Sequence, residues 1–546
     1  PIIRAYLSMP VLDIADISAL RRRLSFYPGY TVRYDMPSHS LTHSPEDAAG
    51  IPVSQTMYLT NMRQSLITKF PEGPMNHPNN LLTDPVLPVR HSLGRKRVLT
   101  LPQTLALASE GKIASFTTAR RHQRHPLKAF LAQLAVIGCQ RAGLTDPPQS
   151  AGRWQKLLRD LTSESKDPDA PWTLISPDLD QPAFLQPPTD QTSTRNLSSP
   201  DDIDIPIHSR QFEPRLRTDR PASADTWIYA LISIQTHGGF LGMGNYGIAR
   251  MGGGFGSRPH TALTTSPVLS EQIERDVRVL LADGRHSSSD PALLWTVPWN
   301  GNKSESLDPD SVHPLCIEVA RIIRLKADER AISACPGPTA SPRIKRDGEI
   351  RRSIADPWAP RSKRTGSPLT VDGAGFSRGL IDSLLTRPDV WELPILALPT
   401  DAEAANIEDR PVYLSASALS RGRGRTSGYH EAYAPVPASV ITSLGSDRPT
   451  PESMHSSGEH SRALRALRTA AVAYLAGGMN RQSDAAKRLA SELAPRIYDA
   501  GRSPEVPAAR STRQALERII ETHAPAALDG HSSAAVARSL LEAGLH

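Results

Sequence analysis

The stretch "GGFLGMGNYGIARMGGGFGSRPHTAL", residues 238–263, contains nine of the chain's 35 glycines. Its first half includes Gly242-x-Gly244-x-x-Gly247, the letter pattern of a dinucleotide-binding loop, and its second half includes the run Gly252–Gly254. Glycine removes the side chain and permits positive φ, so this density indicates a backbone that lies directly against something else. The identity of the group against which this backbone lies decides between the possible folds.

The surrounding residues argue against a dinucleotide-binding loop. In a Rossmann fold the third glycine opens a helix whose N-terminus receives the pyrophosphate. Here Gly247 is followed by "IARMGGGFGSRP", whose glycines and proline disfavour a helix. No acidic residue follows a second strand to bind a ribose, and no Gly-Lys-Ser/Thr phosphate loop is present. An oxidoreductase is therefore the least favoured alternative.

Two arginines flank the second glycine run, Arg250 and Arg258. Glycine with flanking arginine is the composition expected where a main chain enters a nucleic-acid groove and arginines hold phosphates. The same composition occurs in the stretch 421–425, where Arg421, Arg423 and Arg425 alternate with glycines, as in a flexible or hairpin-like segment that contacts phosphate. The structural alternative for the glycine stretch is a tight turn region inside the body of the protein.

The overall composition permits a nucleic-acid partner. The chain has 546 residues, a formal charge of +7, 39% hydrophobic residues and 49 prolines. That length is enough for a large core and suggests two to four domains. The prolines predict many loops, and loops on a scaffold often carry function.

Cysteines and hydropathy limit the class of protein. The three cysteines form no C-x-x-C pair, so we expect neither a zinc site nor a disulfide framework, no cofactor, and a reducing compartment. The longest apolar run, residues 129–138, is far shorter than a membrane span, and the first residues lack a signal-peptide layout. We therefore expect a cytoplasmic protein with no membrane partner.

The periodicity of apolar residues predicts an α+β fold, a mixed α/β body followed by a C-terminal four-helix bundle. In the body, strands are expected within 79–90 and 96–102, helices over 125–143, 153–161 and 269–284, and a helix or a strand over 226–236. Gly284 is the expected C-terminal cap of the third helix. Four alanine-rich amphipathic segments predict the bundle, namely 461–476, 483–500, 511–523 and 532–543.

The predicted domains follow from these patterns. They are an N-terminal extension of unclear role (1–78), the mixed α/β body (79–445), a linker (446–460) and the helical bundle (461–546). The polar stretch 186–224 is a long loop that is either functional or disordered.

Catalytic motifs are not evident. His122 and His125 lie among arginines, a hostile setting for a metal, and His430 beside Glu431 lacks the spacing of a zinc-binding helix. No nucleophile elbow and no paired carboxylates with two-metal spacing occur. We expect a binding protein and not an enzyme.

Several stretches occur in the order found in one known family. They are "NLLTDPVLPVR" (80–90), "LTLPQTLA" (99–106), "PAFLQ" (182–186), the glycine stretch (242–258), "DPWAP" (356–360) and "RGRGRTSGYHE" (421–431). In this order they resemble the large subunit, CasA, of the type I-E CRISPR Cascade surveillance complex. The resemblance covers residues 79–546 and implies the body and bundle described above.

The resemblance also implies a role. The family's large subunit reads the protospacer-adjacent motif (PAM) on double-stranded DNA, mainly from the minor groove, helps to open the duplex, and provides a landing site for the helicase–nuclease. Its other implied partners are the remaining Cascade subunits and the 5′ end of the CRISPR RNA.

Four groups of residues match the family's functional elements by position. The glycine loop would comprise Arg250, Gly252, Gly253, Gly254 and Arg258, and the minor-groove finger Lys345, Arg346 and Arg351. The wedge hairpin would comprise Arg423, Arg425, Thr426 and Ser427, although family members often carry an amide at its tip and this chain has none there. The loop that contacts RNA and the neighbouring subunit would include His208, Arg210 and Gln211. A scaffold that binds nucleic acid without reading a motif is the second alternative.

Overall fold

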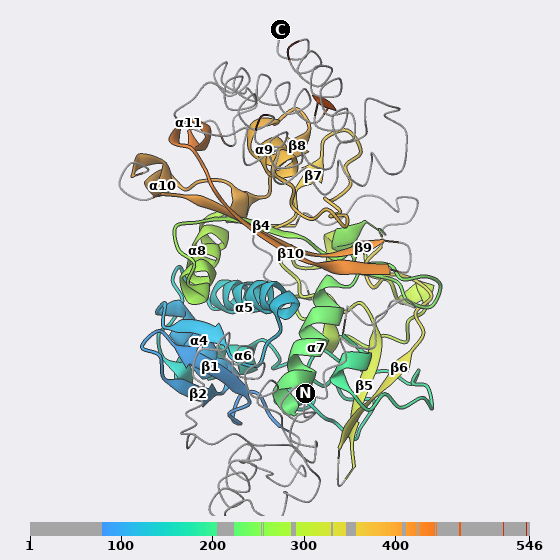
Figure 1. Ribbon diagram of the computed structural model, residues 1–546. Coiled ribbons are helices and arrows are strands. Elements are labelled where there is room, and N and C mark those ends of the chain that lie inside the picture. Colours follow the sequence, from blue (N-terminus) through green and yellow to red (C-terminus); the bar gives the residue numbers. More distant parts are fainter. Residues whose placement is uncertain are drawn as a thin grey trace, which may run out of the picture. The chain divides into compact units, whose positions relative to one another are not determined.

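The computed structural model describes residues 79–444, except 205–222, 253, 255, 285–290, 329–330, 346–355, 407–410, 423–424 and 443, together with the isolated residues 469, 470, 517 and 542. The predicted extension, linker and helical bundle therefore lie outside the described residues, apart from those four. The described part combines α-helices with antiparallel strands (Figure 1), which confirms the predicted α+β class of the body.

A small three-stranded sheet opens the described chain. Strand β1 (Leu87–His91) pairs with β2 (Lys96–Leu99) on one side and with β3 (Ile113–Phe116) on the other, both antiparallel. Helix α4 (Leu101–Ser109) follows β2 directly. It begins with a capping box, in which the Thr100 hydroxyl accepts from Gln103 N at 3.2 Å and Gln103 Oε1 accepts from Thr100 N at 3.0 Å.

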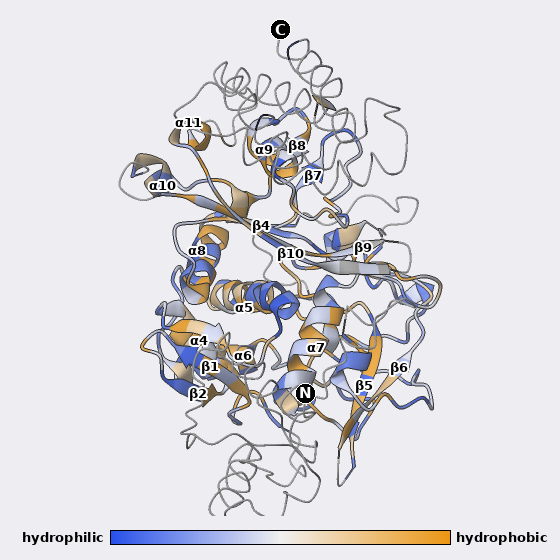
Figure 2. Cartoon of the chain, in the orientation of Figure 1, coloured by the Kyte–Doolittle hydropathy of each residue, from blue (hydrophilic) through white to orange (hydrophobic). Residues whose placement is uncertain are grey.

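Three helices form the interior of the body, α5 (Arg121–Arg141), α7 (Ala224–His237) and α8 (Leu269–Ala282). Helix α5 packs against both of the others, and α6 (Ala151–Asp160) packs against α4. The hydropathy colouring of Figure 2 separates the hydrophilic first turns of α5 from its apolar remainder, which is almost entirely buried. The segment predicted as helix or strand is α7, and its burial on nearly every face explains why periodicity did not distinguish the two.

Helix α8 follows its predicted pattern closely. Ile273, Val277 and Leu280 are buried, whereas Leu281, assigned to the same face, is partly exposed. Gly284 lies just beyond the helix with φ +66°, the left-handed conformation expected of a C-terminal cap.

A second three-stranded sheet, in the order β10-β9-β4, is formed by strands far apart in the sequence. Strand β4 (His260–Thr264) pairs with β9 (Tyr413–Gly422), and β9 pairs with β10 (Arg425–Pro435), all antiparallel. Strand β4 pairs with β9 only as far as Ser417. Beyond that residue the sheet consists of β9 and β10 alone. One face of this sheet covers an apolar cluster that includes Leu263, Leu414 and Ile381.

Smaller elements complete the described chain. Two further antiparallel pairs are present, β5 (Ile322–Ala327) with β6 (Ile332–Gly337) and β7 (Arg361–Ser362) with β8 (Trp391–Glu392). The last helices are α9 (Arg378–Thr386), α10 (Asp401–Ala405) and α11 (Ala438–Ile441).

Candidate nucleic-acid interface

The glycine stretch connects the C-terminus of α7 to β4 without an α-helix. After Gly247 comes a three-residue 3-10 helix, Ala249–Met251, and the chain then enters an antiparallel sheet. A dinucleotide-binding loop requires a parallel strand before it and an α-helix after it. The fold therefore excludes the dinucleotide-binding alternative at Gly242-x-Gly244-x-x-Gly247.

The first half of the stretch packs against its own backbone. A Cβ atom added to Gly239 would lie 2.0 Å from the carbonyl oxygen of Gly256, and one added to Gly247 would lie 2.3 Å from the carbonyl carbon of Gly239. Phe240 N donates to Gly254 O at 2.9 Å, which ties the two halves together. The structural interpretation is therefore correct for Gly239 and Gly247, since side chains there would collide with main chain.

The run Gly252–Gly254, which matches the family's glycine loop, differs from the closely packed Gly239 and Gly247. Gly252 has φ +55°, a left-handed conformation that follows the 3-10 helix, and Gly252 and Gly254 are both partly exposed. Gly254 N donates to Met251 O at 2.9 Å, so the backbone turns sharply at this point. Gly253 lies outside the described residues.

Arg250 does not occupy the solvent-facing position that phosphate contact requires. Its side chain is 1% exposed, and Nη1 donates to Glu318 Oε1 at 2.8 Å while Nη2 donates to Pro314 O at 2.9 Å. The other Glu318 oxygen accepts from Ala249 N at 2.7 Å. One buried carboxylate therefore binds both the guanidinium and the start of the 3-10 helix, and holds the entrance of the glycine loop.

Arg258 is likewise internal and holds the exit of the loop. Its Nε and Nη2 donate to the two carboxylate oxygens of Asp356 at 2.6 and 2.9 Å, and its guanidinium carbon lies 5.0 Å from the centre of the Trp358 ring. Burial raises the pKa of Asp356, but the charge and hydrogen bonds of Arg258 outweigh it and hold that pKa below its ordinary value. The prediction that Arg250 and Arg258 reach phosphates thus does not fit this conformation, because both are committed to buried carboxylates.

The predicted finger segment is anchored at both ends. Lys345 N donates to Leu307 O at 2.9 Å before the segment, and Asp356 and Trp358 are buried after it. Arg346 and Arg351 lie outside the described residues, so of the three predicted finger residues the structure places only Lys345, which is partly exposed.

The predicted wedge lies at the turn of the β9–β10 hairpin. Arg425 pairs with Gly422 and Thr426 with Arg421, and the register shifts between Thr426 and Gly428. This confirms the hairpin-like backbone predicted for the arginine–glycine stretch. Arg423 lies outside the described residues, whereas the backbone of Ser427 belongs to β10.

Three segments with predicted DNA contacts meet at strand β4. Arg258 bonds Asp356 as described above, the Ser257 hydroxyl donates to Leu419 O in β9, and Thr261 N donates to Trp358 O at 2.9 Å. The glycine loop, the end of the finger segment and the hairpin are thereby joined, although up to 162 residues separate them in the sequence.

The predicted RNA-contact residues His208, Arg210 and Gln211 lie outside the described residues. The neighbouring part of the same loop is ordered against the body, where Leu197 N donates to Ala334 O at 2.9 Å. Within the described chain, no cluster of three or more histidine, cysteine or acidic side chains has a geometry suited to a metal ion. The described helices also include none with the length and apolarity to cross a membrane.

Sequence reasoning missed the carboxylates that bind the two arginines. Glu318 lies in "CIEVA" with no motif around it, and Asp356 enters only as part of the stretch "DPWAP". Each is separated from its arginine by more than sixty residues, so no local pattern connects the partners.

Comparison with protein-family models and with curated protein sequences finds no match. Solved structures are similar over most of the chain. A CRISPR associated protein from Thermus thermophilus is 14% identical with a TM-score of 0.59, covering 86% of this chain and 99% of that one. Thermus thermophilus CasA (Cse1) is 16% identical with a TM-score of 0.56 and the same coverage. A chain of a CRISPR RNA-guided surveillance complex is 15% identical with a TM-score of 0.53, covering 85% and 99%. This chain therefore has the fold of the CasA (Cse1) proteins.

Proposed function

We propose that the chain is the PAM-reading large subunit of a type I-E Cascade complex, acting in antiviral defence in the cytoplasm. The observation that carries this proposal is the meeting at β4 of the glycine loop, the end of the finger segment and the hairpin. A guide-dependent complex leaves most sequence reading to base pairing, so its protein needs few contacts to a short motif. One compact group of loops is enough for that task.

The main chain of Gly252–Gly254 is the proposed motif-reading element. The minor groove is narrow and presents a degenerate pattern, so backbone groups with one or two cations suffice there. Arg250 and Arg258 fix the two ends of this loop through Glu318 and Asp356 and do not touch DNA themselves. The cations would come from the finger, from Lys345, Arg346 and Arg351.

The β9–β10 turn is the proposed wedge, which enters the duplex next to the motif and separates the first base pair. Support comes from its place at the end of a two-stranded extension and from Arg421, Arg423 and Arg425 around the turn. Arginine can hold the separated strands by their phosphates, a contact that needs no amide at the tip.

The remaining partners complete the role. The loop with His208, Arg210 and Gln211 would contact the 5′ end of the CRISPR RNA and a neighbouring Cascade subunit. The bound complex would then recruit the helicase–nuclease, which supplies the catalysis that this chain does not.

Binding of target duplexes with randomised flanking trinucleotides, by the reconstituted complex with and without this chain, tests the proposal. We expect a few flanks to bind at least about tenfold better, roughly 1.4 kcal/mol, only when the chain is present. Equal binding of every flank would show the alternative, a nucleic-acid-binding scaffold that does not read a motif.

A further inference from the structure

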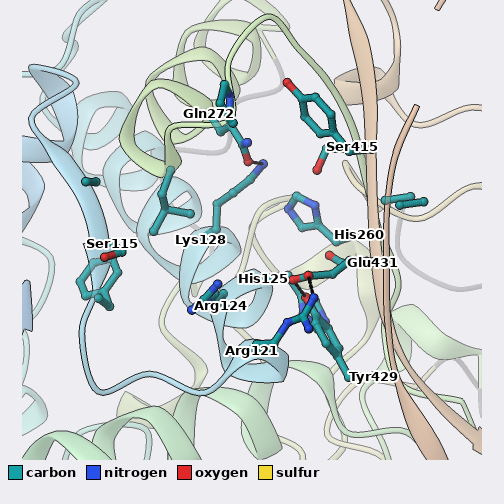
Figure 3. Close-up of a pocket in the computed structure, with 18 residues that line it drawn as sticks. Ser115, Arg121, Arg124, His125, Lys128, His260, Gln272, Ser415, Tyr429 and Glu431 are labelled. Atoms are coloured by element: carbon teal, nitrogen blue, oxygen red, sulfur yellow. Dashed lines mark hydrogen bonds and ion pairs between the residues drawn. The ribbon is translucent and has the colours of Figure 1, made fainter. Parts of the chain in front are cut away.

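A cavity of about 480 Å³ lies beside the β4–β9–β10 sheet, and its lining does not include the glycine-loop residues 250–258. Its walls come from β3, from the first turns of α5, from the start of α8 and from strands β4, β9 and β10 (Figure 3). This volume is within the range of small-molecule sites, about 300–1,000 Å³. Nothing in the proposed reading of DNA uses this cavity.

Two arginines and one carboxylate are exposed at the edge of the cavity, which leaves a net positive charge there. Arg121 and Arg124, both exposed, lie on the first turns of α5, and Arg121 Nη2 donates to Glu431 at 2.5 Å. Arg124 forms no ion pair with any described residue. The N-terminus of α5 lies at the same place and adds the partial positive charge of the helix dipole. The opening therefore favours an anionic group, and Arg124 is the cation best placed to bind one.

The interior of the cavity is polar but carries little net charge. Lys128, which is 3% exposed, lies 3.2 Å from Asp276 and donates to Gln272 Oε1 at 3.3 Å, so its charge is already compensated. His260 is 2% exposed, and Figure 3 shows its ring pointing into the cavity. Its Nε2 has no hydrogen-bond partner among the described residues.

Burial keeps the imidazoles at this site neutral. Desolvation, reinforced by the charge of Lys128, lowers the pKa of His260 well below its ordinary value, and desolvation lowers the pKa of His125 to about 3. A neutral imidazole offers one donor and one acceptor. A buried nitrogen without a partner costs free energy, which a ligand with a neutral polar edge would recover.

Aromatic rings add flat packing surfaces. Tyr429 stacks on His125 with centroids 5.6 Å apart, and Tyr433, 44% exposed, stacks on Tyr413 at 4.5 Å. Phe116 also lines the cavity. The cavity thus combines arginines at its exposed edge, aromatic side chains and, inside, the Nε2 of a neutral imidazole that has no hydrogen-bond partner among the described residues.

We propose that this cavity binds one nucleoside monophosphate unit, with the phosphate on Arg124 and Arg121 and the base edge on His260. The unit could be a free nucleotide or a single nucleotide of a strand, because both present the same chemistry. This inference goes beyond the proposed function and does not depend on PAM reading.

Calorimetric titration of the full-length chain alone, without guide RNA, tests the proposal with the four nucleoside monophosphates, inorganic phosphate and adenosine. We expect at least one monophosphate to bind with a Kd below about 1 mM, at least about tenfold tighter than phosphate or adenosine. Arg124→Gln should weaken that binding at least about tenfold, and this exposed side chain can be replaced without disturbing the core. Arg153→Gln, the same charge change on the exposed face of α6, should leave it unchanged.

A 5′-phosphorylated single-stranded trinucleotide distinguishes the two sources. If it displaces the monophosphate from the wild type, the site accepts a nucleotide within a strand, whereas failure to displace it assigns the site to a free nucleotide. The proposal is overturned if no monophosphate binds, if phosphate alone binds equally well, or if Arg124→Gln and Arg153→Gln have the same effect. Because the complex is not involved, these results are separate from those of the flank-library experiment.

Discussion

Arg258 and Asp356, 98 residues apart in the sequence, form a two-point ion pair in the interior, with N–O distances of 2.6 and 2.9 Å. Both side chains are about 2% exposed. The pair joins the exit of the glycine loop to the end of the finger segment. The proposed reading of DNA depends on that junction, because it fixes two of the three proposed contact elements relative to each other.

Removing the charge of Asp356 should destabilise the fold strongly. Asp356→Asn leaves the buried Arg258 guanidinium uncompensated, and we expect the free energy of unfolding to fall by about 3–5 kcal/mol. The matched control is Asp389→Asn, which breaks an exposed pair with Arg387 at 2.7 Å and should cost at most about 1 kcal/mol. Urea unfolding monitored by circular dichroism measures the free energy of unfolding of both variants. An equal loss in the two would show that Asp356→Asn does not leave the Arg258 charge buried and unpaired.

Glycines 247 and 379 should respond in opposite directions to the same substitution. Gly247→Ala places a methyl group 2.3 Å from the main chain of Gly239, so the backbone must shift, at a cost of about 3 kcal/mol or more. Gly379, in the first turn of α9, has no atom near its added Cβ, and Gly379→Ala should stabilise by a few tenths to about 1 kcal/mol. Thermal unfolding checks the sign of each, and a neutral Gly247→Ala would contradict the close approach.

The hairpin arginines should act on DNA through phosphates. In the reconstituted complex, Arg425→Gln should weaken binding of all flanking sequences alike and reduce the slope of log K against log salt concentration by about 1. Arg278→Gln, an exposed change on α8 outside the proposed contact elements, is the control and should leave the slope unchanged. A flank-dependent effect of Arg425→Gln would instead show that this arginine reads bases.

Three buried histidines should make stability depend on pH. The pKa of His125 is lowered to about 3, and those of His237 and His260 lie well below 6.5, in each case mainly through desolvation. The nearby positive charges of Arg258 and Lys128 also lower these pKa values. The unfolded chain therefore binds more protons, so stability is complete above about pH 6.5 and is lost as pH falls toward the folded pKa values.

Each of these histidines should lower the free energy of unfolding by about 1.4 kcal/mol for every pH unit below its pKa in the unfolded chain. Urea unfolding between about pH 7 and 5 measures this slope before most carboxylates titrate. His260→Phe keeps an aromatic ring against Trp358 and removes one of the three histidines that take up a proton on unfolding. It should therefore lower the slope of the free energy of unfolding against pH by about one third. An unchanged slope would show that His260 is protonated in the folded state.

The sequence predicted the elements whose signals are local. Helix α8 combines an apolar stripe with a terminal glycine at φ +66°, and the hairpin is signalled by alternating arginine and glycine around its turn. Both features depend on neighbours within a few residues, so a single sequence is enough to find them.

The environment of the glycine stretch could not be predicted in the same way. Gly239 is required by the carbonyl of Gly256, which approaches only after the chain turns back, and Arg250 is buried by Glu318, 68 residues away. Arginine next to glycine has the same appearance whether it faces phosphate or a buried carboxylate. The cavity beside the β4–β9–β10 sheet is likewise assembled from separate segments, none of which carries a ligand-binding motif.

Flank selection by the complex carrying Gly253→Val in this chain is the decisive test of whether the glycine loop reads the motif, with Gly379→Val as the control for adding the same side chain elsewhere. Both variants are first checked for wild-type unfolding midpoints and for assembly into the complex. If the glycine loop reads the motif, Gly253→Val binds all flanking trinucleotides alike while Gly379→Val keeps the wild-type preference. If Gly253→Val assembles and retains that preference, the glycine loop does not read the motif.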